Sequence, residues 1–174
     1  PGLGRNPANG VLLDYFLKEK ADTVKVTLEI LDGSGKVIRS YTNKKDDSFK
    51  PYPGGPPAKQ VIPAEAGLNR FAWDFRTEAL SGVPGVYVYG DYSGYRVAPG
   101  KYKARITHKG QSSETDFEII ADPKVIATAA DWTAQQEFLK QASDQFEEVH
   151  KNVNKMRQAK KQIETYNEAL KDNA

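Results

Sequence analysis

The chain has 174 residues, of which 39% are hydrophobic and 28% are charged, and it contains no cysteine. This length fits one β-domain of about 100 to 150 residues with an appendage. The formal charge of +2 is too small to indicate a nucleic-acid-binding surface, and the absence of cysteine excludes disulfides and thiolate metal sites. No apolar run approaches the roughly 20 residues that a membrane-spanning helix needs. We therefore expect neither nucleic-acid binding nor membrane insertion.

The first strand is expected directly after a short linker. Residues 1–10 hold three Gly, two Pro and two Asn, a composition typical of a connection between domains. VLLDYFL at residues 11–17 is the first predicted strand. Because the chain starts with Pro-Gly and stops within a charged helical pattern, we expect it to be a piece of a longer protein.

The strongest β pattern lies in residues 23–42. Residues 23–32 alternate strictly between polar and apolar side chains. The apolar face consists of Val24, Val26, Leu28 and Ile30. The next four residues, Asp-Gly-Ser-Gly, tolerate positive φ, and an extended pattern resumes after them. These features predict a half-buried strand followed by a hairpin.

Residues 67–76, GLNRFAWDFR, form the strand around which the domain is expected to fold. The preceding residues 43–66 contain five Pro and are predicted to be a long surface loop, partly polyproline-like. Phe71, Trp73 and Phe75 alternate, so all three fall on one face of a strand. Each can bury about 150 to 250 Å² there. We expect a core strand of a β-sandwich, with Trp73 between the layers.

Two further segments complete the predicted sandwich. Residues 77–100 carry four tyrosines separated by glycines, which is typical of a short edge strand and a loop. Residues 101–122 alternate again and are expected to form a closing hairpin, with Tyr102 near a strand corner. The fold class predicted for residues 11–122 is therefore mainly β: an antiparallel two-layer sandwich of about seven strands. Its structural core is expected to include Phe71, Trp73, Phe75 and Tyr102.

The periodicity changes after Asp122-Pro123 and predicts one long helix in residues 123–174. Thr128 is its expected N-cap, with Asp131 three residues on. A helix of 40-odd residues is about 60 to 65 Å long. Its apolar side chains recur at alternating steps of three and four, as in a coiled coil. This heptad seam consists of Leu139, Ala142, Phe146, Val149, Val153, Met156, Ile163 and Leu170, and Lys160 and Asn167 fill its two remaining positions.

The sequence offers no catalytic constellation. His108 and His150 have no second histidine or cysteine at ligand spacing. Asp74 and the Asp46-Asp47 pair have no recognisable cleft around them. The sequence contains neither a phosphate-binding glycine loop nor a nucleophile elbow. We therefore predict no catalytic residue, no metal site and no cofactor.

Four tyrosines and one basic run are the candidates for binding. Exposed faces of Tyr87, Tyr89, Tyr92 and Tyr95 could stack on sugar rings, but tyrosine is also favoured in edge strands for packing alone, and packing is the stronger interpretation. Five basic residues and no acidic ones lie between Lys151 and Lys161. They are expected to form a solvated helix face or to pair with an acidic partner helix, in preference to binding a polyanion.

Residues 67–106 carry a resemblance to a known family. An aromatic strand ends in Trp-Asp-x-Arg, a Gly- and Pro-rich loop follows, and Ala-Pro-Gly-x-Tyr leads into an alternating strand. This order resembles the C-terminal domain of large secreted bacterial proteins with BNR-type propeller repeats, the sortilin-like or glycosyl-hydrolase-like class. Other segments similar to that domain are GRNPANGVLLDYFLKEK, VTLEILDGSGKVIRSY, PGVYVYG and ADPK. A weaker likeness extends to the Ig-like domain of flagellar hook-capping proteins.

The resemblance implies an Ig-like or fibronectin-III-like sandwich that follows a β-propeller in a secreted or periplasmic protein. Any hydrolase chemistry would lie in the propeller, none of whose motifs has a counterpart here. The chain is therefore expected to be a non-catalytic accessory or interaction module whose partner is the N-terminal propeller. The alternative is a carbohydrate-binding module that uses residues 87–95. A third interpretation, in which the chain lines the cleft of a glycoside hydrolase, is less favoured.

The heptad seam also predicts an oligomer. A sandwich of about 120 residues cannot cover a helix of this length. Exposing the remaining apolar stripe to water is unfavourable in free energy. The resemblance implies a truncated helical hairpin, in which a returning helix covers the seam. For this chain alone we expect self-association through residues 139–170, antiparallel so that the basic runs stay apart. Lys160 and Asn167 should make that association modest.

Overall fold

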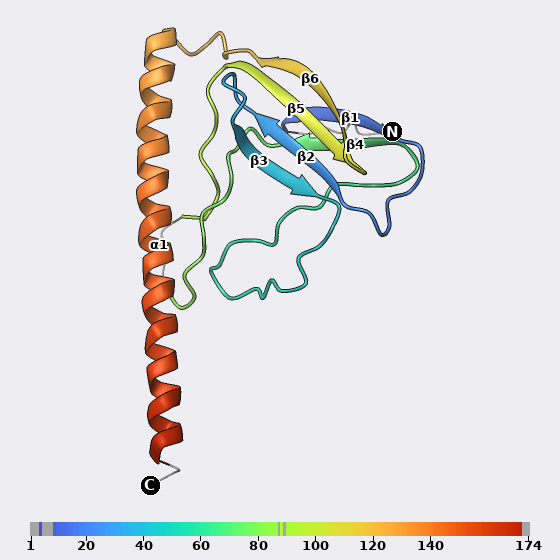
Figure 1. The fold of residues 1–174 in the computed structure, drawn as a ribbon. Coiled ribbons are helices and arrows are strands. Elements are labelled where there is room, and N and C mark those ends of the chain that lie inside the picture. Colours follow the sequence, from blue (N-terminus) through green and yellow to red (C-terminus); the bar gives the residue numbers. More distant parts are fainter. Residues whose placement is uncertain (1–3, 5–8, 87, 89, 172–174) are drawn as a thin grey trace.

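The computed structural model describes residues 4, 9–86, 88 and 90–171, and this part of the chain forms a small β-sandwich with one long helix beside it (Figure 1). Six strands are present in the described residues, and every pairing between them is antiparallel. The predicted antiparallel two-sheet arrangement is confirmed, with six strands in place of about seven.

The two sheets differ in size. One sheet has two strands, β1 (Val11–Leu17) and β4 (Gly67–Trp73). The other has four strands in the order β3-β2-β5-β6, which are β2 (Val26–Leu31), β3 (Val37–Thr42), β5 (Gly100–His108) and β6 (Gln111–Ile119). Residues 43–66 form the predicted long loop, which carries only an isolated bridge among its described residues.

The β2–β3 hairpin forms where the alternating pattern and the glycines predict it. Asp32 closes the turn, because its Oδ1 accepts hydrogen bonds from the amides of Ser34 at 2.9 Å and Lys36 at 3.0 Å. Gly35 has a φ of 84°, which glycine adopts without strain. The pairing register shifts between Ile30 and Leu31. Both side chains are buried, Ile30 within the core cluster and Leu31 outside it.

Trp73 lies between the two sheets and is 0% exposed. Its indole Nε1 donates a hydrogen bond to the carbonyl of Arg76 at 2.8 Å, so the buried polar atom is satisfied. Tyr102 and Phe117 of the opposite sheet contact the indole at centroid distances of 6.0 and 6.1 Å. Tyr102 in turn donates from its hydroxyl to the carbonyl of Ala98 at 2.7 Å. This bond ties the start of β5 to the loop before it.

The sequence prediction that Phe75 continues the face of Phe71 and Trp73 is wrong. β4 ends at Trp73, and Phe75 adopts a φ of 63°. The chain turns here because it leaves the sheet to pair with a later loop: the amide of Val97 donates to the carbonyl of Phe75 at 2.9 Å. Phe75 is therefore only half-buried, although its ring still lies 6.1 Å from that of Trp73.

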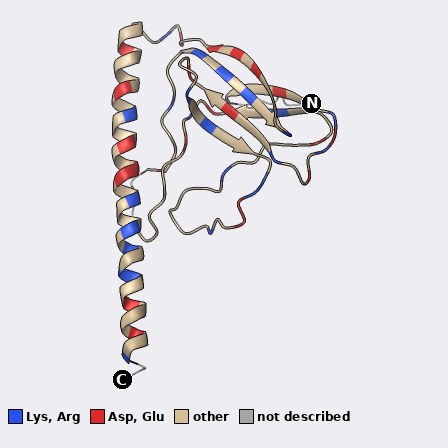
Figure 2. Ribbon diagram, in the orientation of Figure 1, with Lys and Arg blue, Asp and Glu red and all other residues tan. Residues whose placement is uncertain are grey.

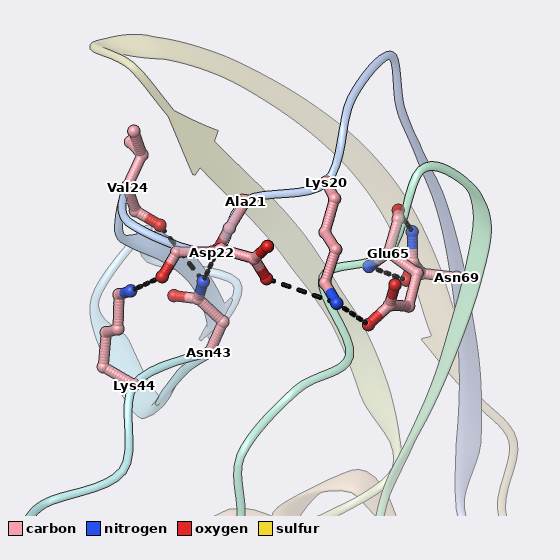
Figure 3. A network of polar contacts seen from close by, with 8 residues as sticks. All are labelled: Lys20, Ala21, Asp22, Val24, Asn43, Lys44, Glu65 and Asn69. Atoms are coloured by element: carbon pink, nitrogen blue, oxygen red, sulfur yellow. Dashed lines mark hydrogen bonds and ion pairs between the residues drawn. The ribbon is translucent and has the colours of Figure 1, made fainter.

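Two asparagines fasten the irregular segments at one end of the sandwich (Figure 3). Asn43 accepts from the amide of Val26 at 2.8 Å and donates to the carbonyls of Ala21 and Val24 at 2.8 and 3.1 Å. Asn69 does the same for the end of the long loop, accepting from the Glu65 amide at 3.0 Å and donating to the Glu65 carbonyl at 2.8 Å. Backbone groups that no strand satisfies are thereby paired.

The helix α1 (Ala129–Lys171) begins at the predicted cap and runs without interruption for 43 residues. The hydroxyl of Thr128 accepts from the amide of Asp131 at 3.2 Å, and the carboxylate of Asp131 accepts from the Thr128 amide at 2.8 Å. This reciprocal pair is a capping box, as predicted. α1 extends well beyond the sandwich at its C-terminal end (Figure 1). In the described part of the chain, no helix is apolar enough over a sufficient length to cross a lipid bilayer.

Candidate interaction surface

A loop that leaves the sandwich after β4 forms the platform on which α1 rests. We call the described residues between 76 and 98 the docking loop. Its two arms pair with each other, through the amide of Thr77 and the carbonyl of Tyr95 at 3.0 Å and the amide of Leu80 and the carbonyl of Tyr92 at 2.8 Å. The arms are tied to β3 by a hydrogen bond from Arg39 to the carbonyl of Thr77 at 2.7 Å. The platform is therefore fixed to the larger sheet.

Polar side chains of α1 make the hydrogen bonds to this loop. The carboxylate of Glu147 accepts from both the amide and the hydroxyl of Ser81, each at 2.6 Å. His150 Nδ1 lies 2.8 Å from the Ser81 carbonyl, and Asn154 donates to the Gly82 carbonyl at 2.8 Å. Further bonds come from Gln136 and Arg157, which donate to the carbonyls of Arg96 and Pro84. The helix is thus docked by hydrogen bonds to loop backbone.

Aromatic rings support the same contact from the side of the loop. The ring of Tyr92, which is 2% exposed, lies 5.7 Å from that of His150. The backbone at Gly82 approaches Tyr52 closely, because a Cβ there would lie 2.1 Å from the Tyr52 hydroxyl oxygen. Burial raises the pKa of Tyr52, and the neighbouring Tyr92 raises it further. Tyr52 and Tyr92 therefore belong to the packing beneath the docked helix.

Glu147 is the charged group at the centre of the docked surface. Partial burial alone would raise the pKa of its carboxyl, but the bonds from Ser81 and the ammonium of Lys151, 3.2 Å away, outweigh burial. The pKa of Glu147 consequently lies below its ordinary value. At neutral pH the carboxylate is ionised, and its hydrogen bonds are charge-assisted.

The heptad seam predicted from the sequence, which we call the helix stripe, lies to one side of this contact, and most of its large side chains stay exposed. Five of its residues are 56 to 68% exposed. They are Phe146, Val149, Met156, Ile163 and Leu170. Leu139, Ala142 and Val153 are half-buried. The docking residues Glu147, His150, Asn154 and Arg157 each follow a stripe residue by one position, and one position turns a helix by about 100°. The sandwich therefore holds α1 by a polar side and leaves the apolar side open.

The four tyrosines proposed as a sugar-binding group do not share one environment. Tyr87 and Tyr89 lie outside the described residues. Tyr92 is buried against His150, so neither face of its ring is open to a sugar. Tyr95 is half-buried, and burial raises the pKa of its hydroxyl. Stacking on Tyr92 would require the docking loop to move.

An open groove of about 320 Å³ lies between β3, the docking loop and α1. Its charged lining residues are of both signs: Lys36, Glu78, Lys140, Asp144, Glu147 and Lys151. Several of them already pair, as in the contact of Lys140 with Asp144 and that of Lys151 with Glu147. Among the residues that the structure describes, no three His, Cys, Asp or Glu side chains converge as metal ligands would.

Sequence reasoning missed the docking residues, because it considered His150 only as a metal ligand or a catalytic group. A signal was present: Glu147, His150, Asn154 and Arg157 recur at steps of three and four, as the stripe does. Polar residues at such spacing are more often a solvated face than a contact. Their partners are backbone groups of residues 81, 82 and 84, which leave no pattern in the sequence.

Comparisons of the chain with models of protein families, with curated proteins and with solved structures found no match. The likeness to the C-terminal domain of BNR-repeat proteins consequently rests on the sequence segments quoted above.

Proposed function

We propose that this chain is a non-catalytic interaction module whose sandwich holds a long helix in place for contact with another protein surface. The observation that carries the proposal is the rotation of α1: its hydrogen bonds to the docking loop come from one polar side, while five of the large apolar stripe residues, from Phe146 to Leu170, stay exposed. Exposed apolar surface that is contiguous and rigidly presented is typical of an interaction site.

The resemblance supplies the wider setting of this proposal. The module would follow the propeller of a secreted or periplasmic BNR-repeat protein of the sortilin-like or glycosyl-hydrolase-like class and would act as its accessory domain. An Ig-like or fibronectin-III-like sandwich is supported by buried Trp73 between the sheets and by the hydrogen bond from Tyr102 to the Ala98 carbonyl, which is similar to a tyrosine corner. The heptad spacing of the stripe supports a coiled-coil-like role for α1.

The titratable groups that meet at the docking loop support the non-catalytic part of the proposal. Glu147 and His150 are a carboxylate and an imidazole one helical turn apart, which is a pairing that an active site could use. Both are engaged with Ser81. These two side chains therefore serve to hold the helix against the docking loop.

The alternative, a carbohydrate-binding module that uses residues 87–95, is favoured by the four tyrosines in that segment. Half-buried Tyr95 lines the groove beside α1, where a sugar ring could approach it.

One experiment tests both functions on the same protein. The intact chain is mixed with the apolar dye ANS, and separately with a panel of soluble plant, bacterial and chitin oligosaccharides followed by calorimetry and by product analysis. We expect dye fluorescence that falls in Met156→Glu/Ile163→Glu but not in the control Gln158→Glu/Gln162→Glu, whose side chains lie on the opposite, exposed side of α1. We expect neither saturable heat nor hydrolysis with any sugar.

The carbohydrate function makes the opposite prediction. Saturable binding that Tyr89→Ala weakens, and that Tyr166→Ala on the distal helix leaves unchanged, would replace the interaction module by the sugar-binding one. Tyr166 is a matched control because it is 72% exposed and lies on α1, away from the docking loop.

A further inference from the structure

We propose that the partner of the helix stripe is a second copy of this chain, with the two α1 helices antiparallel and crossing near Lys151. This inference rests on the proposed function, because it assumes that the stripe is an interaction surface. In each copy, the sandwich leaves room for this pairing, because the docking residues lie about 100° around the helix from the stripe. A second helix can therefore lie on the stripe without displacing the docking loop.

The stripe matches itself in this register. Pairing each stripe position with the one equally far from residue 151 on the second copy places Val149 opposite Val153. The next apolar layers are Phe146 opposite Met156 and Leu139 opposite Ile163. Large apolar side chains thus meet in three of the five layers on each side of the centre, where they can pack as knobs into holes.

The polar positions of the stripe also find suitable neighbours in this register. Lys160 falls opposite Ala142, the smallest stripe side chain, where a lysine stem can lie along the helix with its ammonium in water. Asn167 falls opposite Gln135, so that two amides face each other. These layers are weaker than apolar ones, and they should make the pair modest in strength and fixed in register.

Two exposed aromatics outside the stripe point to the same register. Phe138 is 69% exposed and Tyr166 is 72% exposed, and each occupies the heptad position that precedes a stripe residue. In an antiparallel pair, residues at this position lie beside their counterparts on the second helix. With the crossing near residue 151, Phe138 of one copy lies beside Tyr166 of the other. Neither residue belongs to the helix stripe.

Charge favours the antiparallel over the parallel arrangement. Figure 2 shows that the charged positions in the first half of α1 are mostly acidic and that a basic band lies in its middle. In the proposed register the basic run 151–161 of one copy is level with residues 141–151 of the other, where Asp144, Glu147 and Glu148 make the local charge less positive. A parallel pair in register would instead set Lys160 against Lys160 and the two basic runs side by side.

The test combines sedimentation with single-cysteine crosslinking of the intact chain, which has no cysteine of its own. We expect the sedimentation of the wild type to move from one chain mass toward two between about 10 μM and 1 mM, a range typical of modest affinity. Met156→Glu/Ile163→Glu should remain at one chain mass throughout that range. The control Gln158→Glu/Gln162→Glu adds the same charge and should associate as the wild type does.

Crosslinking tests the register of the two α1 helices. Asn152→Cys should give a covalent dimer with a short bismaleimide, because residue 152 lies next to its own copy at the crossing. Ile163→Cys should not, since the two copies of residue 163 would be about 36 Å apart at 1.5 Å per residue. Dimers from Ile163→Cys without dimers from Asn152→Cys would overturn the antiparallel pairing. Unchanged association of the Met156→Glu/Ile163→Glu variant would also overturn it.

A chain that stays monomeric from about 10 μM to 1 mM overturns the self-pairing. ANS binding then tests whether the proposed interaction function still holds. If ANS fluorescence still depends on Met156 and Ile163, the stripe is open and serves a different partner. If ANS fluorescence does not depend on them, both the pairing and the interaction function fail.

Discussion

Replacing Trp73 by alanine should lower the free energy of unfolding by about 3 to 5 kcal/mol, the largest loss we expect from any single substitution. Trp73 is fully buried between the sheets, and its ring contacts Tyr102 and Phe117 of the opposite sheet. Alanine would leave a cavity that these rings cannot fill by small movements. Urea denaturation followed by circular dichroism measures the change.

The chain offers a matched control for this substitution. Trp132, its only other tryptophan, is half-buried at the start of α1, so Trp132→Ala should cost about 1 kcal/mol or less. A loss below about 1 kcal/mol for Trp73→Ala would contradict the buried position of its indole. The ring would then be available as a ligand platform.

Removing the Glu147 side chain should loosen the contact between α1 and the docking loop at Ser81. Its carboxylate accepts two hydrogen bonds from Ser81 at 2.6 Å. Because hydrogen bonds to charged groups contribute about 1.5 to 3 kcal/mol, Glu147→Ala should raise hydrogen exchange at the Ser81 amide roughly 10- to 150-fold. Glu148→Ala removes an exposed carboxylate one position along the helix and should leave exchange at Ser81 unchanged. Equal exchange in the two variants would contradict docking through Glu147.

The same contact should weaken in acid. The folded-state pKa of Glu147 is lowered from 4.5, so its contribution to docking is fully present above pH 4.5. It is lost as the pH falls through the lower folded value, because the protonated carboxyl is no longer an ionised acceptor. Exchange at Ser81, corrected for its intrinsic pH dependence, should therefore be flat from pH 7 to 5 and rise below pH 4.5. In Glu147→Ala the rise should be absent.

Local patterns in the sequence were sufficient to predict most of the elements. The Asp32 turn and the Thr128 cap depend on side chains within a few positions of one another, and each forms as expected. The alternation in residues 23–32 predicted β2, which is shorter than expected because it begins at Val26 and leaves Val24 outside the strand. The end of β4 was not predictable in the same way. Phe75 continues the aromatic alternation, but pairing of its carbonyl with the amide of Val97, 22 positions later, turns the chain out of the sheet.

The candidate interaction surface could likewise be predicted only in part. Heptad spacing identified the helix stripe, because apolar residues at steps of three and four define one face of any helix. It could not identify the side of α1 that meets the sandwich. That choice depends on the amide and carbonyls of residues 81 and 82, and every residue carries such groups. The burial of Tyr92 beneath His150 follows from this docking, so the sequence could not predict it either.

The sandwich holds α1 by its polar side and leaves most of the helix stripe open, and Met156, the single methionine of the chain, reports on that exposure. Met156 lies in the stripe and is 63% exposed. A ¹³C label on its methyl group gives one NMR signal, whose relaxation by a soluble paramagnetic agent measures solvent access. At about 10 μM, where modest self-association is dissociated, we predict relaxation close to that of the same methyl group in urea. Relaxation several-fold weaker at that dilution would mean that the sandwich covers the stripe, and it would contradict the polar docking of α1 described above.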